Sequence, residues 1–368
     1  MMTNKLSFYI HIPFCVRKCD YCAFYSLAGQ TEETKEAYFN ALIQQISSFE
    51  TDREISTIYF GGGTPPMLGV ERICDLIKLF KSKFSLSENV EITVEVNPGT
   101  VNQKDLATLK KAGANRLSVG IQAANDEILK SIGRIHSFDQ AKRCIFEARE
   151  AGFENISADI IFALPQQSFE DFTDGVKRII SLDVDHISAY SLQIEEGTKI
   201  YERRESLCFP DEDGEEAQYQ ALCEILSDAG FEHYEISSFA KNGFRSRHNM
   251  NYWMQGEYIG FGAAAHSFFE KKRFSAVCDV QKFIEMSKIS VFAPTDFHSA
   301  EVISEEESAE ERILLGLRTS EGVEIPESAF SVAERICQLG YGRFENGILS
   351  LNSKGFRVSN EIIAEIIL

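Results

Sequence analysis

The sequence predicts an α/β protein built on a parallel β-sheet that is closed or partly closed into a barrel, followed by a smaller C-terminal domain. Three observations carry this prediction. Short β-rich runs alternate with amphipathic segments over the first two-thirds of the chain, the alternation repeats six times, and most β-rich runs end near Gly or Pro. Parallel neighbours joined through a helix make right-handed crossovers, so six repeats build one (β/α)6 sheet.

The six expected strands are rich in Ile, Val, Tyr and Phe. They cover residues 6–12, 55–60, 90–96, 116–122, 156–164 and 186–194. The segments between them carry apolar residues at helical spacing, as in the first one, where Tyr38, Leu42 and Ile46 lie on one face. Helices are therefore expected at 32–49, 70–84, 103–113, 137–152 and 168–182.

The end of the chain is expected to form a separate unit. We interpret 289–307 as a connection, 308–323 as the start of a small helical unit, and 348–368 as a strand, a turn, a strand and a helix. This order suggests a winged-helix-like domain. The predicted organisation is thus a barrel at 1–235, an extension at 236–290 and a C-terminal domain at 291–368.

Composition and charge exclude several classes of protein. The 368 residues are 44% hydrophobic, yet no run approaches the roughly 18 apolar residues that a membrane span needs. A net charge of −19 without a basic patch argues against nucleic acid as a partner, because it repels phosphate backbones. The N-terminus has no secretion signal and six of the nine cysteines are scattered singly, which predicts a reducing, cytoplasmic location.

The most informative motifs are expected at one rim of the barrel. Cys15, Cys19 and Cys22 follow the first strand, GGGTPP at 61–66 follows the second, NPG at 97–99 follows the third, and Gln122 ends the fourth. The carboxyl ends of parallel strands gather at one rim, so these motifs should converge. The glycines alone would fit a plain tight turn, but their position beside the other motifs favours a ligand-binding loop.

The three clustered cysteines predict a metal site. Zinc with His11 as the fourth ligand is one interpretation, but structural zinc usually takes two separated pairs of ligands, and the sequence has no second pair. A cubane [4Fe–4S] cluster is normally held by four cysteines. Three cysteines would leave one iron open to a small molecule, and we favour that interpretation.

The C-x3-C-x2-C spacing after the first strand resembles that of the radical S-adenosylmethionine (SAM) family. The resemblance continues through YIHIPFC, YFGGGTPP, EVNPG, NRLSVGIQ and RHNMNYW, and is greatest to the branch that contains oxygen-independent coproporphyrinogen III dehydrogenase and the haem chaperones. It implies a partial (β/α)6 barrel with a [4Fe–4S] cluster on Cys15, Cys19 and Cys22. It also implies that SAM is bound by Tyr9, Gly62, Gly63, Glu95, Gln122, Arg134 and Asp159, although Arg134 would also fit a surface ion pair.

Within this branch the sequence favours a haem chaperone over a dehydrogenase. The dehydrogenase pattern has a fourth cysteine where this chain has Phe24, and a longer region before its cysteines than the 14 residues found here. The HNMNYW segment at 248–253 fits the pattern of the chaperone branch. Haem and haem-accepting proteins, for example of the respiratory chain, are then the expected partners, and a homodimer is left open.

The HNMNYW segment is the expected haem site. His248 can ligate iron, and Tyr252 and Trp253 offer flat surfaces to a porphyrin. Arg245 and Arg247 could pair with the two propionates. Two alternatives stay open: the segment could be a connection that only packs in the core, and His266 could be the axial ligand.

Overall fold

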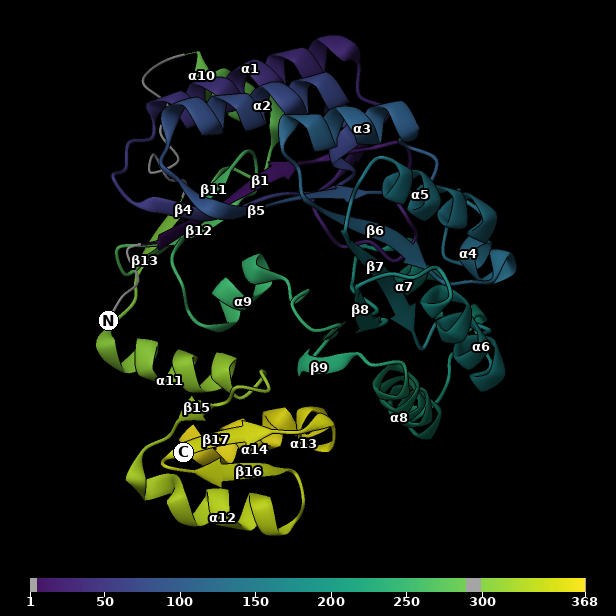
Figure 1. Ribbon diagram of the computed structural model, residues 1–368, viewed down its shortest axis with the longest axis vertical. Helices are drawn as coiled ribbons and strands as arrows, with labels where there is room; N and C mark the ends of the chain where they lie inside the picture. The colour runs from purple at the N-terminus through teal and green to yellow at the C-terminus, as the bar shows by residue number, and fades with distance from the viewer. Residues whose placement is uncertain (1–4, 289–298, 368) are drawn as a thin grey trace.

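The computed structural model describes residues 5–288 and 299–367, and its centre is a twelve-stranded sheet (Figure 1). Six neighbouring strands are parallel and follow one another in chain order: β1 (Lys5–Ile12), β4 (Glu54–Gly62), β5 (Leu86–Val96), β6 (Arg116–Gln122), β7 (Asn155–Phe162) and β8 (His186–Ser191). All six expected strands are therefore confirmed. β1 pairs with β4 on one side and with β11 (Tyr258–Phe261) on the other, and the open sheet curves around its concave face as a partial barrel (Figure 1).

Helices cover the outer face of this sheet (Figure 1). The expected ones are α1 (Glu32–Ser48), α2 (Val70–Lys83), α3 (Gln103–Ala112), α5 (Phe138–Glu150) and α6 (Phe169–Ile180). The short α4 (Asp126–Ser131) was not predicted, and α8 (Glu212–Asp228) begins in an acidic run whose Asp211 caps it by accepting from the Gly214 N–H. None of the helices in the described ranges has the length and apolar character needed to cross a membrane.

The parallel strands place apolar side chains outward and polar side chains inward. In β6, Leu117, Val119 and Ile121 belong to the main apolar core, whereas Arg116 and Ser118 line an internal cavity. Inward-facing residues of the other strands line the same cavity: Tyr59, Glu95, Asp159, Ser188 and Tyr190. A parallel sheet buried on both faces normally has near-continuous apolar runs, so this alternation marks a polar lumen.

Strands before and after residue 235 continue the sheet at its two edges. At one edge are β10 (Ser238–Ala240) and β9 (Glu232–Glu235); at the other are β11, β12 (His266–Phe269), β13 (Lys272–Ser275) and β14 (Ser299–Val302). The division proposed at residue 235 thus falls inside one sheet. Of the connection expected at 289–307, residues 289–298 lie outside the described residues, and the remainder contains β14 and the start of α11 (Glu305–Gly316).

Helix α9 (Arg247–Trp253) lies on the concave side of the sheet (Figure 1). The carboxylate of Glu91 accepts hydrogen bonds from the backbone N–H groups of Arg247 and His248, both at 3.1 Å, and so fixes the start of the helix. Glu91 and Thr57, which contacts His248, precede the cavity-lining Glu95 and Tyr59 on their strands. Helix α9 therefore closes the lumen from the amino-terminal side, and Asn249 reaches the cavity.

The C-terminal residues form a small unit with its own apolar core. Its elements after α11 are β15 (Val323–Glu324), α12 (Phe330–Gln338), β16 (Gly342–Glu345), β17 (Ile348–Leu351), α13 (Ser353–Arg357) and α14 (Ser359–Ile367). Of the strand, turn, strand and helix expected at 348–368, the first strand (β17) and the last helix (α14) are present. The second strand is wrong, because Asn352 accepts from the N–H groups of Lys354 and Gly355 and so starts the helix α13 there; β17 pairs instead with the preceding β16. Backbone hydrogen bonds of 2.9 Å from Ile236 to Arg318 and from Ser320 to Tyr234 join this unit to the edge at β9.

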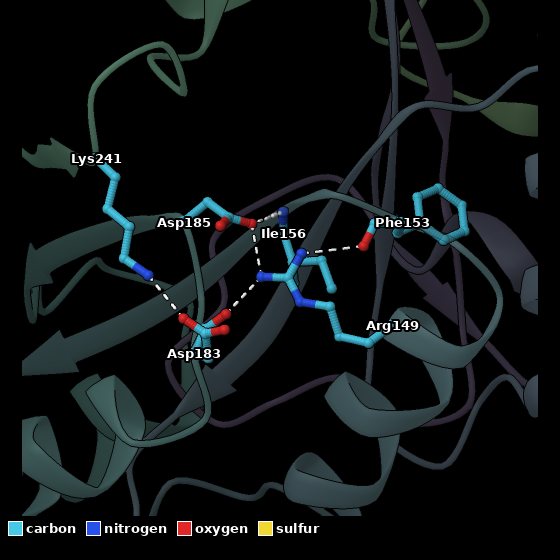
Figure 2. Close-up of polar contacts among 6 residues, drawn as sticks. All are labelled: Arg149, Phe153, Ile156, Asp183, Asp185 and Lys241. Atoms are coloured by element: carbon cyan, nitrogen blue, oxygen red, sulfur yellow. Dashed lines mark hydrogen bonds and ion pairs between the residues drawn. The ribbon is translucent and has the colours of Figure 1, made fainter.

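A polar network fixes the amino-terminal ends of β7 and β8 (Figure 2). Arg149, at the end of α5, donates to the backbone oxygens of Phe153 at 3.0 Å and Asp183 at 2.5 Å, and to the Asp185 carboxylate at 2.8 Å. The same carboxylate accepts from the Ile156 N–H at 2.9 Å. This guanidinium thus has acceptors on two sides, in contrast to Arg116 in the lumen.

Candidate functional site

A cavity of about 540 Å³ extends into the lumen of the partial barrel. It is lined by nine of the predicted site residues: Cys15, Cys19, Cys22, Gly62, Gly63, Glu95, Gln122, Arg134 and Asp159. The prediction that these motifs converge is therefore confirmed. Tyr9 and His248 are not among the lining residues; both pack near Tyr59, with ring centroids 6.2 and 4.9 Å from that of Tyr59.

The cysteine loop is held in place by Asp20, which sequence reasoning missed. Two short strands, β2 (Phe14–Cys15) and β3 (Leu27–Ala28), frame the loop. Within it, the Asp20 N–H donates to Ile132 at 3.0 Å and the Asp20 carbonyl accepts from Ile200 at 2.9 Å. The Asp20 side chain is 5% exposed and forms an ion pair at 3.0 Å with Arg203 of α7 (Lys199–Arg203). Backbone and side chain together fix the loop that carries the thiols.

The thiols receive hydrogen bonds from neighbours that suit a negatively charged sulfur. Arg134 donates from Nη1 to Cys19 Sγ at 3.4 Å, and Thr64 donates to Cys15 Sγ at 3.7 Å. Arg134 also donates to the Asn97 side chain and to the Gly120 carbonyl, both at 2.5 Å. The alternative of a surface ion pair for Arg134 is therefore wrong, because its partners lie inside the cavity.

The arrangement fits an iron–sulfur cluster better than a zinc ion. His11, the fourth ligand in the zinc interpretation, is hydrogen-bonded through Nδ1 to Tyr9 at 2.9 Å and through Nε2 to the Tyr25 carbonyl at 3.0 Å. Among the described residues, no three His, Cys, Asp or Glu side chains are placed to hold one metal ion. With both of its ring nitrogens engaged, His11 is not available as the fourth ligand of the zinc interpretation.

The glycine turn lies directly against the cysteine loop. Gly62 has a φ of +112°, and a Cβ there would stand 2.6 Å from the His11 ring. At Gly63 a Cβ would stand 2.8 Å from the Phe14 carbonyl oxygen and 3.0 Å from Cys15 Sγ. Only glycine allows the backbone to come this close. The N–H groups of the turn are used within the fold, that of Gly62 by Glu95 at 3.1 Å and that of Gly63 by the Ile12 carbonyl at 2.9 Å. The missing side chains leave room for a small ligand beside the thiols.

Glu95 links the third strand to this turn. One carboxylate oxygen accepts from the Tyr59 hydroxyl at 2.9 Å, and the other accepts from the Gly62 N–H at 3.1 Å. Burial, together with the nearby charge of Asp159, raises the pKa of Glu95 to about 7. A carboxylate has about four acceptor positions, so two remain for the hydroxyl groups of a ligand.

Two further predicted residues complete the wall. Gln122 ends β6 with a φ of +69°, a left-handed conformation that is uncommon for a residue other than glycine. Asp159 accepts from the Ser118 hydroxyl at 2.9 Å, and burial raises the pKa of its carboxyl above the usual value. Asn97, from the NPG motif expected at this rim, also lines the cavity, as do Tyr59, Arg116 and Ser118, which were not predicted. Alternating polar residues along the strands were the signal that could have found these three.

The structure places His248 in the interior. It is 1% exposed, with Nδ1 hydrogen-bonded to Thr57 at 2.7 Å and Nε2 hydrogen-bonded to Tyr252 at 2.8 Å. Burial lowers its pKa to about 3, so the ring is neutral. Both ring nitrogens are thus already occupied, and ligation of iron would require one of these hydrogen bonds to break.

The neighbours predicted to assist His248 also have partners. Arg245 forms ion pairs with Glu232 at 2.6 Å and Glu321 at 2.9 Å, and Arg247 donates to the Asn89 carbonyl at 2.5 Å. Trp253 packs against a small apolar cluster. The segment therefore packs in the interior, as one of the two alternatives from the sequence proposed. Haem ligation by His248 stays a prediction. His266 is exposed at the start of β12.

Comparison with known proteins identifies the family. Residues 9–179 match the model of the Radical SAM superfamily. The haem chaperone HemW of Lactococcus lactis is 33% identical over 382 aligned residues, which cover 100% of this chain and 99% of that protein. The chain belongs to the HemW family. HemW of Bacillus subtilis is 36% identical over 361 residues, covering 96% of this chain and 93% of that protein.

The HemW family shares its fold with a solved radical SAM enzyme. Coproporphyrinogen III oxidase (HemN) from Escherichia coli superposes with a TM-score of 0.85, covering 99% of this chain and 90% of that one, at 21% identity. The resemblance to this branch, and the radical SAM fold that it implied, are confirmed.

Proposed function

We propose that this chain is a cytoplasmic haem chaperone that binds a [4Fe–4S] cluster, SAM and haem, and delivers haem to acceptor proteins. The observation that carries the proposal is the 33% identity with a haem chaperone over the whole length of both chains. The cavity supports it, because three cysteines and a glycine turn lie together at its wall.

Each residue at the rim has a role in this proposal. Cys15, Cys19 and Cys22 hold the cluster, which with SAM supplies one-electron chemistry when both are bound. Gly62 and Gly63 present backbone groups to the amino acid part of SAM. Tyr9, Glu95, Gln122, Arg134 and Asp159 are the remaining proposed SAM residues, with Glu95 accepting from the ribose hydroxyls. Tyr9 does not line the cavity, so its proposed contribution to SAM binding is indirect, through its packing against the ring of Tyr59.

The haem ligand has two candidates with different surroundings. His248 is buried and hydrogen-bonded at both nitrogens, so its use requires α9 to rearrange. His266 is exposed and needs no such change. Titrating haemin into the wild type, His248→Ala and His266→Ala, and following the Soret band, separates the two. Loss of the Soret shift in one variant, with unchanged iron–sulfur absorption, identifies the ligand.

The second candidate function is oxidative decarboxylation of coproporphyrinogen III, which the fold shared with the E. coli oxidase favours. Phe24 argues against it, because an apolar side chain that is 71% exposed stands at the rim where the dehydrogenase pattern has a cysteine. The test is to incubate the anaerobically reconstituted protein with coproporphyrinogen III, SAM and a reductant. We expect no protoporphyrinogen to form. Its formation would show that the chain is a coproporphyrinogen III dehydrogenase and would contradict the chaperone proposal.

A further inference from the structure

Arg116 is a buried arginine at the amino-terminal start of β6. Its exposed fraction is 1%, and its side chain is the largest of the fully buried ones. It nevertheless lines the cavity that contains the predicted site residues. No role was assigned to it from the sequence.

The guanidinium of Arg116 has opposite charges nearby, since Glu91 and Asp159 favour its charged form, but it lacks hydrogen-bond partners. Its Nε is buried with no hydrogen-bond partner, and none of the ion pairs formed within 5–288 and 299–367 includes it. Arg149 shows how this fold satisfies an arginine elsewhere, with two backbone oxygens and one carboxylate as acceptors (Figure 2). An arginine has five N–H donors, and leaving a buried donor without an acceptor is costly.

The nearby carboxylates are committed to other groups. Glu91 accepts from two backbone N–H groups of α9, Glu95 from Tyr59 and Gly62, and Asp159 from Ser118. Burial and the nearby charge of Asp159 also raise the pKa of Glu95 to about 7, so that Glu95 is partly protonated at neutral pH and repels an incoming anion less. Arg116 is thus a buried cation that faces a cavity and has unused donors.

We propose that Arg116 binds a carboxylate of the ligand that enters this cavity. A planar guanidinium matches a carboxylate through two parallel hydrogen bonds, and a water-poor site strengthens the pair. Both ligands of the proposed function carry carboxylates: SAM on its amino acid end and haem on its propionates. This inference therefore deepens the proposed function and rests on it.

The position of Arg116 favours a propionate over SAM. The cysteines and Gln122 lie at the carboxyl ends of the strands, whereas Arg116 begins β6, six residues before Gln122. At about 3.3 Å per residue, this separation is about 20 Å along the strand. The amino acid end of SAM is expected beside the cysteines. A carboxylate bound at Arg116 is therefore better supplied by a haem propionate than by SAM.

The test compares ligands that differ only in their carboxylates, using the full chain with its cluster reconstituted. Haemin is compared with haemin dimethyl ester by Soret titration, and SAM with decarboxylated SAM by equilibrium dialysis. The variants are Arg116→Gln and Arg116→Lys, and the matched control is Arg149→Gln, which removes a guanidinium outside the cavity. Thermal unfolding of each ligand-free protein is measured in parallel.

We expect Arg116→Gln to weaken haemin binding at least tenfold, to leave the dimethyl ester unaffected, and not to lower the unfolding temperature of the ligand-free protein. Arg116→Lys should bind haemin with intermediate affinity. Arg149→Gln should lower the unfolding temperature without selecting between haemin and its ester. If SAM affinity falls instead and that of decarboxylated SAM does not, the carboxylate is that of SAM.

Two results would overturn the inference. One is that both Arg116 variants keep the wild-type ratio of affinities between haemin and its dimethyl ester, and between SAM and decarboxylated SAM. The other is a large loss of stability in ligand-free Arg116→Gln, which would show a structural role. Wild-type protein that binds no haemin would instead count against the proposed function, and the SAM comparison would still decide the role of Arg116.

Discussion

Three cysteines differ from the other six in their surroundings. Cys15, Cys19 and Cys22 line the cavity, and two of them receive hydrogen bonds from Arg134 and Thr64. The sequence alone was sufficient to find them, because their spacing is a local feature. It could not find Asp20, whose partners Ile132, Ile200 and Arg203 are remote in the chain and adjacent only in the fold.

Replacing any one of these cysteines should therefore abolish cluster retention. Protein purified anaerobically should contain about four irons per chain on the cubane model. Cys15→Ser, Cys19→Ser and Cys22→Ser should each lose most of this iron and the brown colour, whereas Cys278→Ser, at an exposed thiol, should keep both. Iron and sulfide analysis provides the measurement. Stoichiometric zinc in the wild type would contradict the prediction.

Glu95 should contribute directly to SAM affinity. Replacing its carboxylate by Gln or Ala removes a charged acceptor for the ribose hydroxyls, which should weaken SAM binding by roughly 1–3 kcal/mol. Calorimetry on cluster-loaded protein measures the change, with the exposed Glu196→Gln as the matched control. Unchanged affinity in a folded, cluster-loaded Glu95 variant would remove Glu95 from the site.

Glu95 also makes stability depend on pH. Its pKa in the folded chain is about 7, above the ordinary value of 4.5, so its contribution to stability is complete below pH 4.5 and is lost as the pH rises to about 7. Glu95→Gln removes this dependence. The unfolding free energy of the variant relative to wild type should increase from pH 5 to pH 8 by at most about 3 kcal/mol. Urea titrations at both values measure it, and a pH-independent difference would be contrary to expectation.

At the scale of elements, the order of strands and helices was predictable and the lining of the lumen was not. Runs rich in Ile, Val, Tyr and Phe that mostly end near Gly or Pro identified all six parallel strands, but Ser118 and Arg116 were treated only as parts of a strand. Their inward direction follows from the two-residue alternation of a strand, once Leu117 and Val119 are known to face the helices. The burial of the HNMNYW segment could not be predicted from the sequence either, because Glu91 and Thr57, which hold His248, come from strands that are distant in the chain.

The network in Figure 2 should stabilise the fold independently of the site. Asp185 is 7% exposed and joins Arg149 to the start of β7 through the Ile156 N–H. Asp185→Ala should lower the unfolding free energy by about 3 kcal/mol, because it leaves a partly buried guanidinium and a buried N–H without their carboxylate. Chemical denaturation checks this, and SAM affinity of the folded fraction should not change. A loss below about 0.5 kcal/mol would show that the network is dispensable.

At the scale of the whole molecule, one sheet unites segments that the sequence divided. The edge strands β11–β14 and β10–β9 flank the parallel strands, and the C-terminal unit attaches at β9 through backbone hydrogen bonds. Edge pairings between antiparallel strands involve short segments with weak periodicity, so the sequence did not reveal them. The convergence of the cysteines, the glycine turn and Gln122, in contrast, follows from the parallel order, since that order brings the carboxyl ends of the strands together.

The most direct test of the account is haem transfer by the cluster-loaded protein. Haem-loaded chain is mixed anaerobically with a haem-free acceptor protein in the presence of SAM, and the Soret bands of donor and acceptor are followed together. We predict that the chain binds haem, that the acceptor gains it faster than from free haemin under the same conditions, and that no porphyrinogen is decarboxylated. Absence of haem binding, or protoporphyrinogen formed from coproporphyrinogen III, would contradict the account.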